Sequence, residues 1–219
     1  MCRITEQNKP RFPRRGISIL VGSVFLGIPT YSIGAPHHGA QPFTVVPTHS
    51  SHSPSVGRSV AAVDLSRTIW ERVSDKYGVD PLILYAVALI ESGRSDGVQV
   101  KPWAWAINEE GRGHYHPNKS SAWAGIQTHL ASGRRSVDIG FMQVNLKWHR
   151  NRVQHLEDLL DPQTNIDLGA RILSEAMATC PGNLALGIGR YHAWSNRILA
   201  LRYGRRVLQL ADRLRHKAS

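Results

Sequence analysis

Cysteine is scarce in this sequence, which holds only Cys2 and Cys180. Cys2 lies ahead of the first apolar run, so it does not occupy the position of a lipoprotein cysteine. Removal of the N-terminal segment would leave one thiol, and a single thiol cannot form an internal disulfide bond. The folded part must therefore take its stability from a hydrophobic core.

Long apolar runs are also missing. Residues 17–28, ISILVGSVFLGI, form the longest apolar segment near the N-terminus, and a bilayer-spanning helix needs about 20 residues. This segment follows the basic stretch RFPRRG and precedes small residues near Ala35, which is typical of a signal peptide. We expect residues 1–35 to be a signal peptide that directs export to the periplasm. An uncleaved membrane anchor is the alternative.

Acidic residues are few, with 16 Asp and Glu against 27 Lys and Arg, so the formal net charge is +11. The first 35 residues carry +4 of it, which leaves +7 on the remainder. This positive charge would attract the acidic peptides and phosphates of a cell envelope as readily as nucleic acid. Because export is expected, we predict no nucleic-acid partner.

Periodic patterning is lacking in residues 36–62, which are rich in Pro, Ser, Gly and His and predict a flexible linker. No internal repeat is present, and residues 63–216 are expected to form one domain. Asp64 and the pair Asp80-Pro81 are expected to begin two helices. Further helices are predicted over 118–133, 161–180, 184–194 and 196–214, and a hairpin over 104–116.

The stretch LILYAVALIESG, residues 82–93, is apolar all round until Glu91. A helix with this pattern is buried on every side, and Glu91 falls in its last turn. Apolar surroundings and the negative end of the helix dipole both disfavour the carboxylate anion. Glu91 is therefore a candidate proton donor. A solvent-facing glutamate in a salt bridge is the alternative.

Four short motifs occur in order: ALIESG, DIGFMQVN, DPQTNIDLGARIL and GRYHAW. Together they resemble the soluble lytic transglycosylases (SLT family) of the lysozyme superfamily, over about residues 77–203. The inserted PWAWAIN…GRGHY is similar to the version that accompanies conjugation and type IV secretion systems. The resemblance implies a mainly α, α+β lysozyme-like fold, in which the small β-hairpin lies beside the substrate groove.

The resemblance also implies a reaction. Glu91 matches the acid/base that cleaves the β-1,4 bond between N-acetylmuramic acid and N-acetylglucosamine with formation of a 1,6-anhydro ring. The implied role is local opening of peptidoglycan during assembly of a secretion or conjugation apparatus. We expect a monomer that acts on glycan strands without a metal or other cofactor. The positions that match substrate-binding residues are Ser92, Gln143, Asn145, Tyr191 and His192.

Several of these positions have alternative interpretations. Ser92 could cap local backbone, and Asn145 could be a turn residue. His192 stands where many family members have asparagine. Gly140 is expected to let the backbone approach the sugar, and Asn165 is expected to cap a helix.

Three other function classes remain open. A hydrolytic muramidase of the same fold would need a second carboxylate, and Asp138 is the candidate. A serine hydrolase is suggested by residues 93–97, which fit G-x-S-x-G, but that motif acts at a strand-to-helix turn and a helix precedes it here. The third class is a non-catalytic module that binds glycan or nucleic acid. His114 and His116 form a possible metal pair without a third ligand.

Overall fold

The computed structural model describes residues 63–217, so the predicted signal peptide and linker lie outside the described residues. Within the described range, no helix is both long and apolar enough to cross a membrane. The α-helices are α1 (Ile69–Tyr77), α2 (Pro81–Ser92), α3 (Lys119–Ala131), α4 (Leu146–His149), α5 (Pro162–Ala178), α6 (Leu184–His192) and α7 (Arg197–Lys217). The strands and short 3-10 helices are β1 (Gly93–Ser95), β2 (Val100–Pro102), β3 (Ala106–Glu109), β4 (Arg112–Tyr115), β5 (Val137–Ile139), β6 (Val144–Asn145), η2 (Arg150–Arg152) and η3 (Leu156–Leu160).

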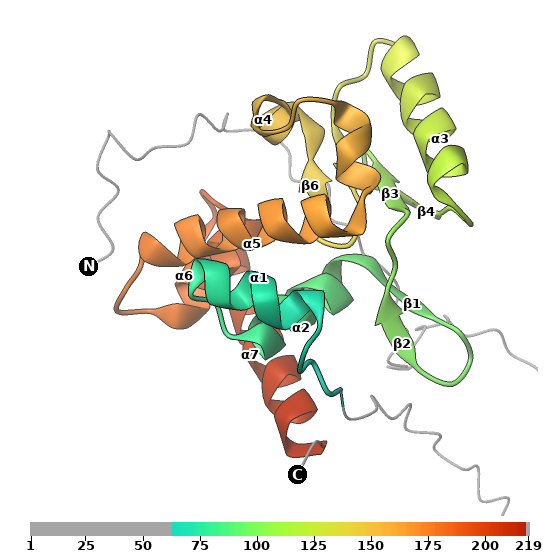
Figure 1. Ribbon diagram of the computed structural model, residues 1–219. Helices are drawn as coiled ribbons and strands as arrows, with labels where there is room; N and C mark the ends of the chain where they lie inside the picture. The colour runs from blue at the N-terminus through green and yellow to red at the C-terminus, as the bar shows by residue number, and fades with distance from the viewer. Residues whose placement is uncertain (1–62, 218–219) are drawn as a thin grey trace, which may run out of the picture.

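Helix α2 is the buried centre of the helical half, as its all-round apolar sequence predicts. It begins where Asp80 accepts hydrogen bonds from the backbone N–H groups of Leu82 and Ile83. Helices α1 and α7 pack directly on it, while α5 packs against α1 and α6, and α6 packs against α7 (Figure 1). The predicted mainly helical α+β fold is confirmed.

The start of α1 differs from the prediction. Asp64 accepts hydrogen bonds from the N–H and hydroxyl of Ser66, and the helix begins only after Thr68. Asp64 therefore closes a local turn, because aspartate side chains bond neighbouring backbone N–H groups in turns as well as in helices.

The predicted hairpin is present as β3 and β4, with Ala106 opposite Tyr115. It belongs to a larger antiparallel sheet of order β4-β3-β5-β6, in which β5 and β6 flank the turn at residues 140–143. A separate two-stranded ribbon, β1–β2, leaves the end of α2. Figure 1 shows the sheet and α3 on one side of α5, and α1, α2 and α7 on the other. Neither β1–β2 nor β5–β6 was predicted.

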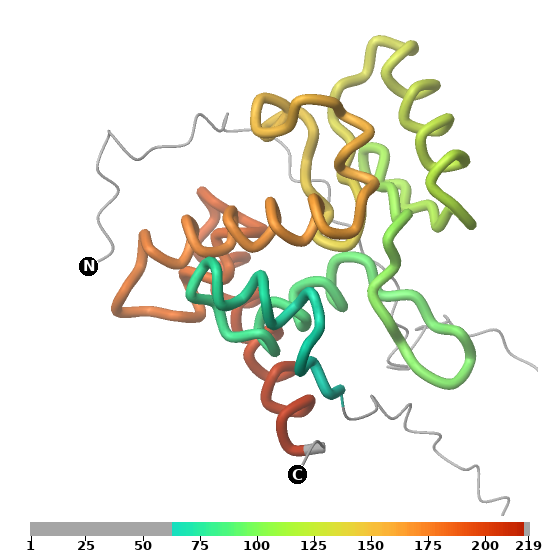
Figure 2. The backbone as a smooth tube through the Cα atoms, viewed as in Figure 1, coloured from blue at the N-terminus to red at the C-terminus, as the bar shows by residue number. Residues whose placement is uncertain are grey.

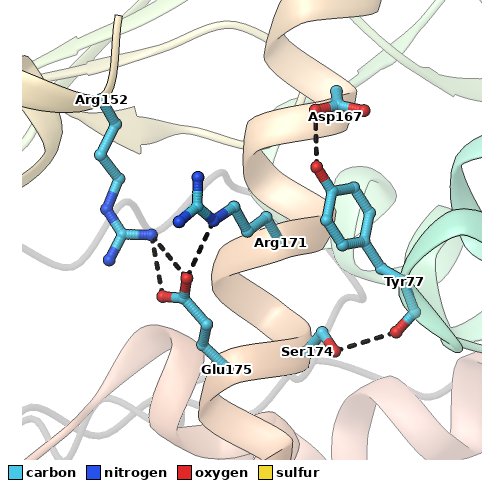
Figure 3. Close-up of polar contacts among 6 residues, drawn as sticks. All are labelled: Tyr77, Arg152, Asp167, Arg171, Ser174 and Glu175. Atoms are coloured by element: carbon cyan, nitrogen blue, oxygen red, sulfur yellow. Dashed lines mark hydrogen bonds and ion pairs between the residues drawn. The ribbon is translucent and has the colours of Figure 1, made fainter. Parts of the chain in front are cut away.

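Polar contacts tie α5 to its neighbours (Figure 3). The Tyr77 hydroxyl at the end of α1 donates to Asp167 at 2.7 Å. Glu175 accepts from Arg152, in η2, at 2.8 Å and from Arg171 at 3.1 Å. Exposed ion pairs of this kind contribute about 0–1 kcal/mol each, so they orient α5 while the apolar core supplies most of the stability.

Asn165 fixes the sheet to the start of α5. Its side chain, 1% exposed, accepts from the Met142 N–H at 2.9 Å and donates to the Ile139 and Leu159 carbonyl oxygens at 2.8 and 2.9 Å. The predicted helix-capping role was wrong, because Asp161 caps α5. Asn165 instead satisfies three backbone groups that connect the turn between β5 and β6 to the core.

Candidate active site around Glu91

Glu91 lies in the last turn of α2 with its side chain 10% exposed. The Tyr203 hydroxyl donates a hydrogen bond to Glu91 Oε1 at 2.6 Å. His192 Nδ1 lies 3.7 Å from the same oxygen, and the His192 ring stacks on Tyr203 at 4.5 Å between centroids. Side chains from α6 and α7 therefore meet at one carboxylate oxygen of α2.

The electrostatics of these partners follow from burial and from the Glu91 charge. Burial, and then the neighbouring Glu91 charge, raise the pKa of Tyr203 well above its usual value, so the phenol remains a neutral donor. Burial lowers the pKa of His192, but the hydrogen bond and charge of Glu91, with the charge of Asp138, outweigh it and raise the pKa overall. Both groups stabilise the Glu91 anion, so its surroundings are more polar than the apolar helix predicted.

Asp138 of β5 is a second carboxylate in the electrostatic field of Glu91. It accepts hydrogen bonds from the Asn108 amide at 2.8 Å and the Asn145 amide at 2.6 Å. Burial raises the pKa of Asp138 to about 6; the two amides lower it, and the Glu91 charge raises it. Asn145 also accepts from the Lys147 N–H as the cap of α4. The amide of Asn145 thus holds Asp138 in place.

Tyr191 of α6 lies within the electrostatic influence of both carboxylates. Its hydroxyl donates to the Met142 carbonyl oxygen at 2.5 Å. Burial, and then the charges of Glu91 and Asp138, raise the pKa of Tyr191 well above its usual value. Its hydroxyl therefore stays protonated and anchors the turn at Met142 close to both acids.

Ser92 is 1% exposed and its hydroxyl is used within the protein. The hydroxyl lies within hydrogen-bonding distance of the Ala88 and Phe141 carbonyl oxygens, at 3.0 and 2.8 Å. It also accepts from the Trp103 N–H at 3.3 Å. This arrangement matches the backbone-capping interpretation and joins the end of α2 to both sheets.

Gln143 has a left-handed backbone, with φ of 46°, in the turn between β5 and β6. Its amide nitrogen donates to the Ala106 and Gly140 carbonyl oxygens at 3.0 and 2.9 Å. Its amide oxygen is buried and has no hydrogen-bond partner among the described residues. The contacts of Gln143 therefore shape the turn between β5 and β6.

Gly140 has φ of +78°. A Cβ at this position would lie 2.4 Å from the Asn165 amide nitrogen. The close approach predicted at Gly140 is therefore made, within the described structure, by a protein side chain.

The serine-hydrolase alternative is excluded by the backbone. Ser95 ends β1, and its hydroxyl accepts from the Gly97 N–H in an exposed ribbon turn. A nucleophile elbow requires a strand that leads into a helix. In residues 63–217, no group of three or more His, Cys, Asp or Glu side chains has the arrangement of a metal site.

Sequence reasoning missed Tyr203 and Asn108 as site residues. Tyr203 shares the inward face of α7 with Val207, so its burial was predictable from helical spacing. Its partner, Glu91, lies 112 positions earlier, and no local pattern connects the two residues.

A family model described as the Transglycosylase SLT domain matches residues 68–202. The chain belongs to this family. The match spans Glu91, Asp138 and His192, and it ends one residue before Tyr203. An SLT domain indicates a lytic transglycosylase that acts on peptidoglycan, so the family predicted from the four motifs is confirmed. The search of curated proteins and the search of solved structures each found no match.

Proposed function

We propose that this SLT protein cleaves the β-1,4 bond between N-acetylmuramic acid and N-acetylglucosamine, with Glu91 as its acid and base. The observation that carries the proposal is the convergence of Tyr203 and His192 on a Glu91 carboxylate that is 10% exposed. A carboxyl group that is nearly buried and contacted by two polar side chains can donate a proton to a bound ligand and accept one back.

The reaction proceeds in two proton transfers. Protonated Glu91 gives its proton to the glycosidic oxygen as the bond from that oxygen to the muramic acid C1 breaks. The resulting carboxylate takes the proton of the sugar's 6-hydroxyl, and the 6-oxygen bonds to C1 to close a 1,6-anhydro ring. The Tyr203 hydroxyl and a protonated His192 stabilise the carboxylate between the two transfers.

The contacts support positioning roles for most of the residues that match substrate-binding positions. The hydroxyls of Ser92 and Tyr191 bond backbone of the turn between β5 and β6. The Gln143 amide bonds the Ala106 carbonyl oxygen of β3. Asn145 holds Asp138. We therefore assign these residues to the construction of the site, and His192 to direct contact with Glu91.

Glu91→Gln tests the proposal, since it keeps the side chain's shape and removes the titratable proton. Lysis of purified sacculi is expected to fall by at least about 100-fold, the scale of general acid catalysis. Glu110→Gln, an exposed residue of the β3–β4 turn, is the control for the charge change. Lysis by Glu91→Gln within about tenfold of wild type would remove Glu91 from the mechanism.

Hydrolysis is the second candidate because Asp138 lies in the field of Glu91. A muramidase uses one carboxyl group as acid and a second carboxylate to activate water or to bond the sugar. With a pKa of about 6, Asp138 is mostly ionised at neutral pH and could serve in that role. Hydrogen bonds from the Asn108 and Asn145 amides hold the Asp138 carboxylate in place, which favours a structural role for Asp138 over a catalytic one. Transglycosylation therefore remains the first candidate.

We propose a periplasmic location from the signal-like residues 1–35. Amino-terminal sequencing of periplasmic protein should read from Pro36, whereas an intact Met1 in the cytoplasm would contradict export. We also propose a role beside a conjugation or type IV secretion apparatus, because of the inserted segment PWAWAIN…GRGHY. Transfer or secretion at the wild-type rate in a strain that carries only Glu91→Gln would exclude that role.

A further inference from the structure

A cationic and aromatic surface begins three residues after Glu91. The Arg94 guanidinium carbon lies 4.4 Å from the Trp103 ring centroid and 5.9 Å from the Tyr115 ring centroid. Both rings are fixed, because Trp103 Nε1 donates to the His116 carbonyl oxygen at 2.7 Å and the Tyr115 hydroxyl donates to backbone of β1 at 2.8 Å. We call Arg94, Trp103 and Tyr115 the arginine platform.

The aromatic rings hold the Arg94 guanidinium in place but leave its positive charge unpaired among the described residues. Contact with ring faces leaves its N–H donors, which lie in the guanidinium plane, free to bond an acceptor. Arg94 is exposed, and within residues 63–217 no hydrogen bond or ion pair engages its guanidinium group. By contrast, Arg152 and Arg171 are paired with Glu175. Arg94 is thus a fixed cation that faces solvent beside the catalytic helix.

The platform is poorly suited to stacking a sugar on Trp103. Arg94 lies over the Trp103 ring, and Trp105 packs edge-to-face on it with centroids 5.9 Å apart. Tyr115 is 42% exposed, but Arg94 lies toward its ring as well. The open groups are therefore the guanidinium N–H donors, and their fork geometry fits a carboxylate.

We propose that Arg94 binds a carboxylate of the peptide stem on the muramic acid at the cleaved bond, an inference that rests on the proposed function. Peptide stems are acidic, and the stem of that sugar must lie close to Glu91. Three residues of extended chain span at most about 11 Å, so Arg94 lies near enough to meet the stem. The platform would make the protein prefer glycan that carries stems over bare glycan.

The test compares soluble glycan strands that carry stems with the same strands stripped by an amidase. Arg94→Gln is expected to raise KM on stem-bearing strands by about tenfold, the effect of losing a charged hydrogen bond. On stripped strands its kcat/KM should stay within about twofold of wild type, because no stem contact exists to lose. Arg94→Lys should fall between, since lysine keeps the charge and loses the fork.

Arg205→Gln, an exposed arginine of α7, controls for the change in net charge and should match wild type on both substrates. Stem-bearing strands whose carboxylates are amidated should bind wild type as weakly as native strands bind Arg94→Gln. Equal losses on stem-bearing and stripped strands, together with a lower Tm, would make Arg94 a structural residue of the ribbon and overturn the inference. Unchanged kinetics of Arg94→Gln on both stem-bearing and stripped strands would also overturn the inference. Wild type that cleaves neither substrate would instead overturn the proposed function and the inference with it.

Discussion

The hydroxyl of Tyr203 is the residue-scale feature that most directly controls Glu91. Tyr203→Phe removes the donor that lies 2.6 Å from Glu91 Oε1 and leaves the ring stacked on His192. We expect kcat to fall by about tenfold or more, because hydrogen bonds to charged groups contribute about 1.5–3 kcal/mol. Tyr85→Phe, which removes a core hydroxyl from the same helix as Glu91, is the control. Wild-type kcat in Tyr203→Phe would show that this contact does not assist the carboxylate.

At the residue scale, the position of Glu91 at the end of a buried helix was easier to predict than its surroundings. Glu91 was identifiable because it ends an apolar helix, and His192 because it lies in a short motif. Ser92 and Gln143 lie in motifs too, yet their contacts are to backbone within the protein. A short motif marks structural and binding requirements alike, so it cannot separate them. Tyr203 was missed because its contact with Glu91 depends on how α7 packs against α2.

At the scale of elements, helices were predictable where a cap and an apolar face coincide. Asp80 before Pro81 begins α2, Asn118 caps α3 and Asp161 caps α5. The strands β1, β2, β5 and β6 have two or three residues each. A strand that short is too brief for an alternating pattern to be recognised. The extent of the sheet therefore became visible only in the structure.

The Asn165 side chain gives a prediction at the scale of elements, because it joins the β5–β6 turn to α5. Asn165→Asp has nearly the same shape but places an oxygen, in place of the donor NH2, against the Ile139 and Leu159 carbonyl oxygens. We expect a loss of about 3 kcal/mol or more in the free energy of unfolding, because two buried acceptors lose their donor beside a buried charge. Chemical denaturation at neutral pH measures it.

Asn118→Asp is the matched control for that substitution. The Asn118 side chain acts only as an acceptor at an exposed helix N-terminus, and aspartate caps a helix as well as asparagine. Its stability should stay within about 0.5 kcal/mol of wild type. Equal stability of both variants would show that the Asn165 amide donors do not hold the turn in place.

At the scale of the whole molecule, the site forms where the helical half meets the sheet. The tube in Figure 2 follows the chain from α2 through the ribbon and the sheet to α5, and back through α6 to α7 beside α2. This path brings Glu91 and Tyr203 together and sets Asp138 within the electrostatic reach of Glu91. One carboxylate is held by a phenol and a histidine, and the other by two amides. The two carboxylates therefore lie in different polar environments.

The product of digestion tests the central claim, that Glu91 is the one carboxylate that takes part in the reaction and the sugar's 6-hydroxyl is the nucleophile. Purified protein is incubated with sacculi in heavy-oxygen water, and the released muropeptides are analysed by mass spectrometry. Intramolecular attack by a tethered hydroxyl gains heavily from proximity, so we expect 1,6-anhydro-N-acetylmuramic acid ends without heavy oxygen. Reducing ends that carry the heavy oxygen would contradict it and would identify a hydrolase, with Asp138 as the candidate second carboxylate.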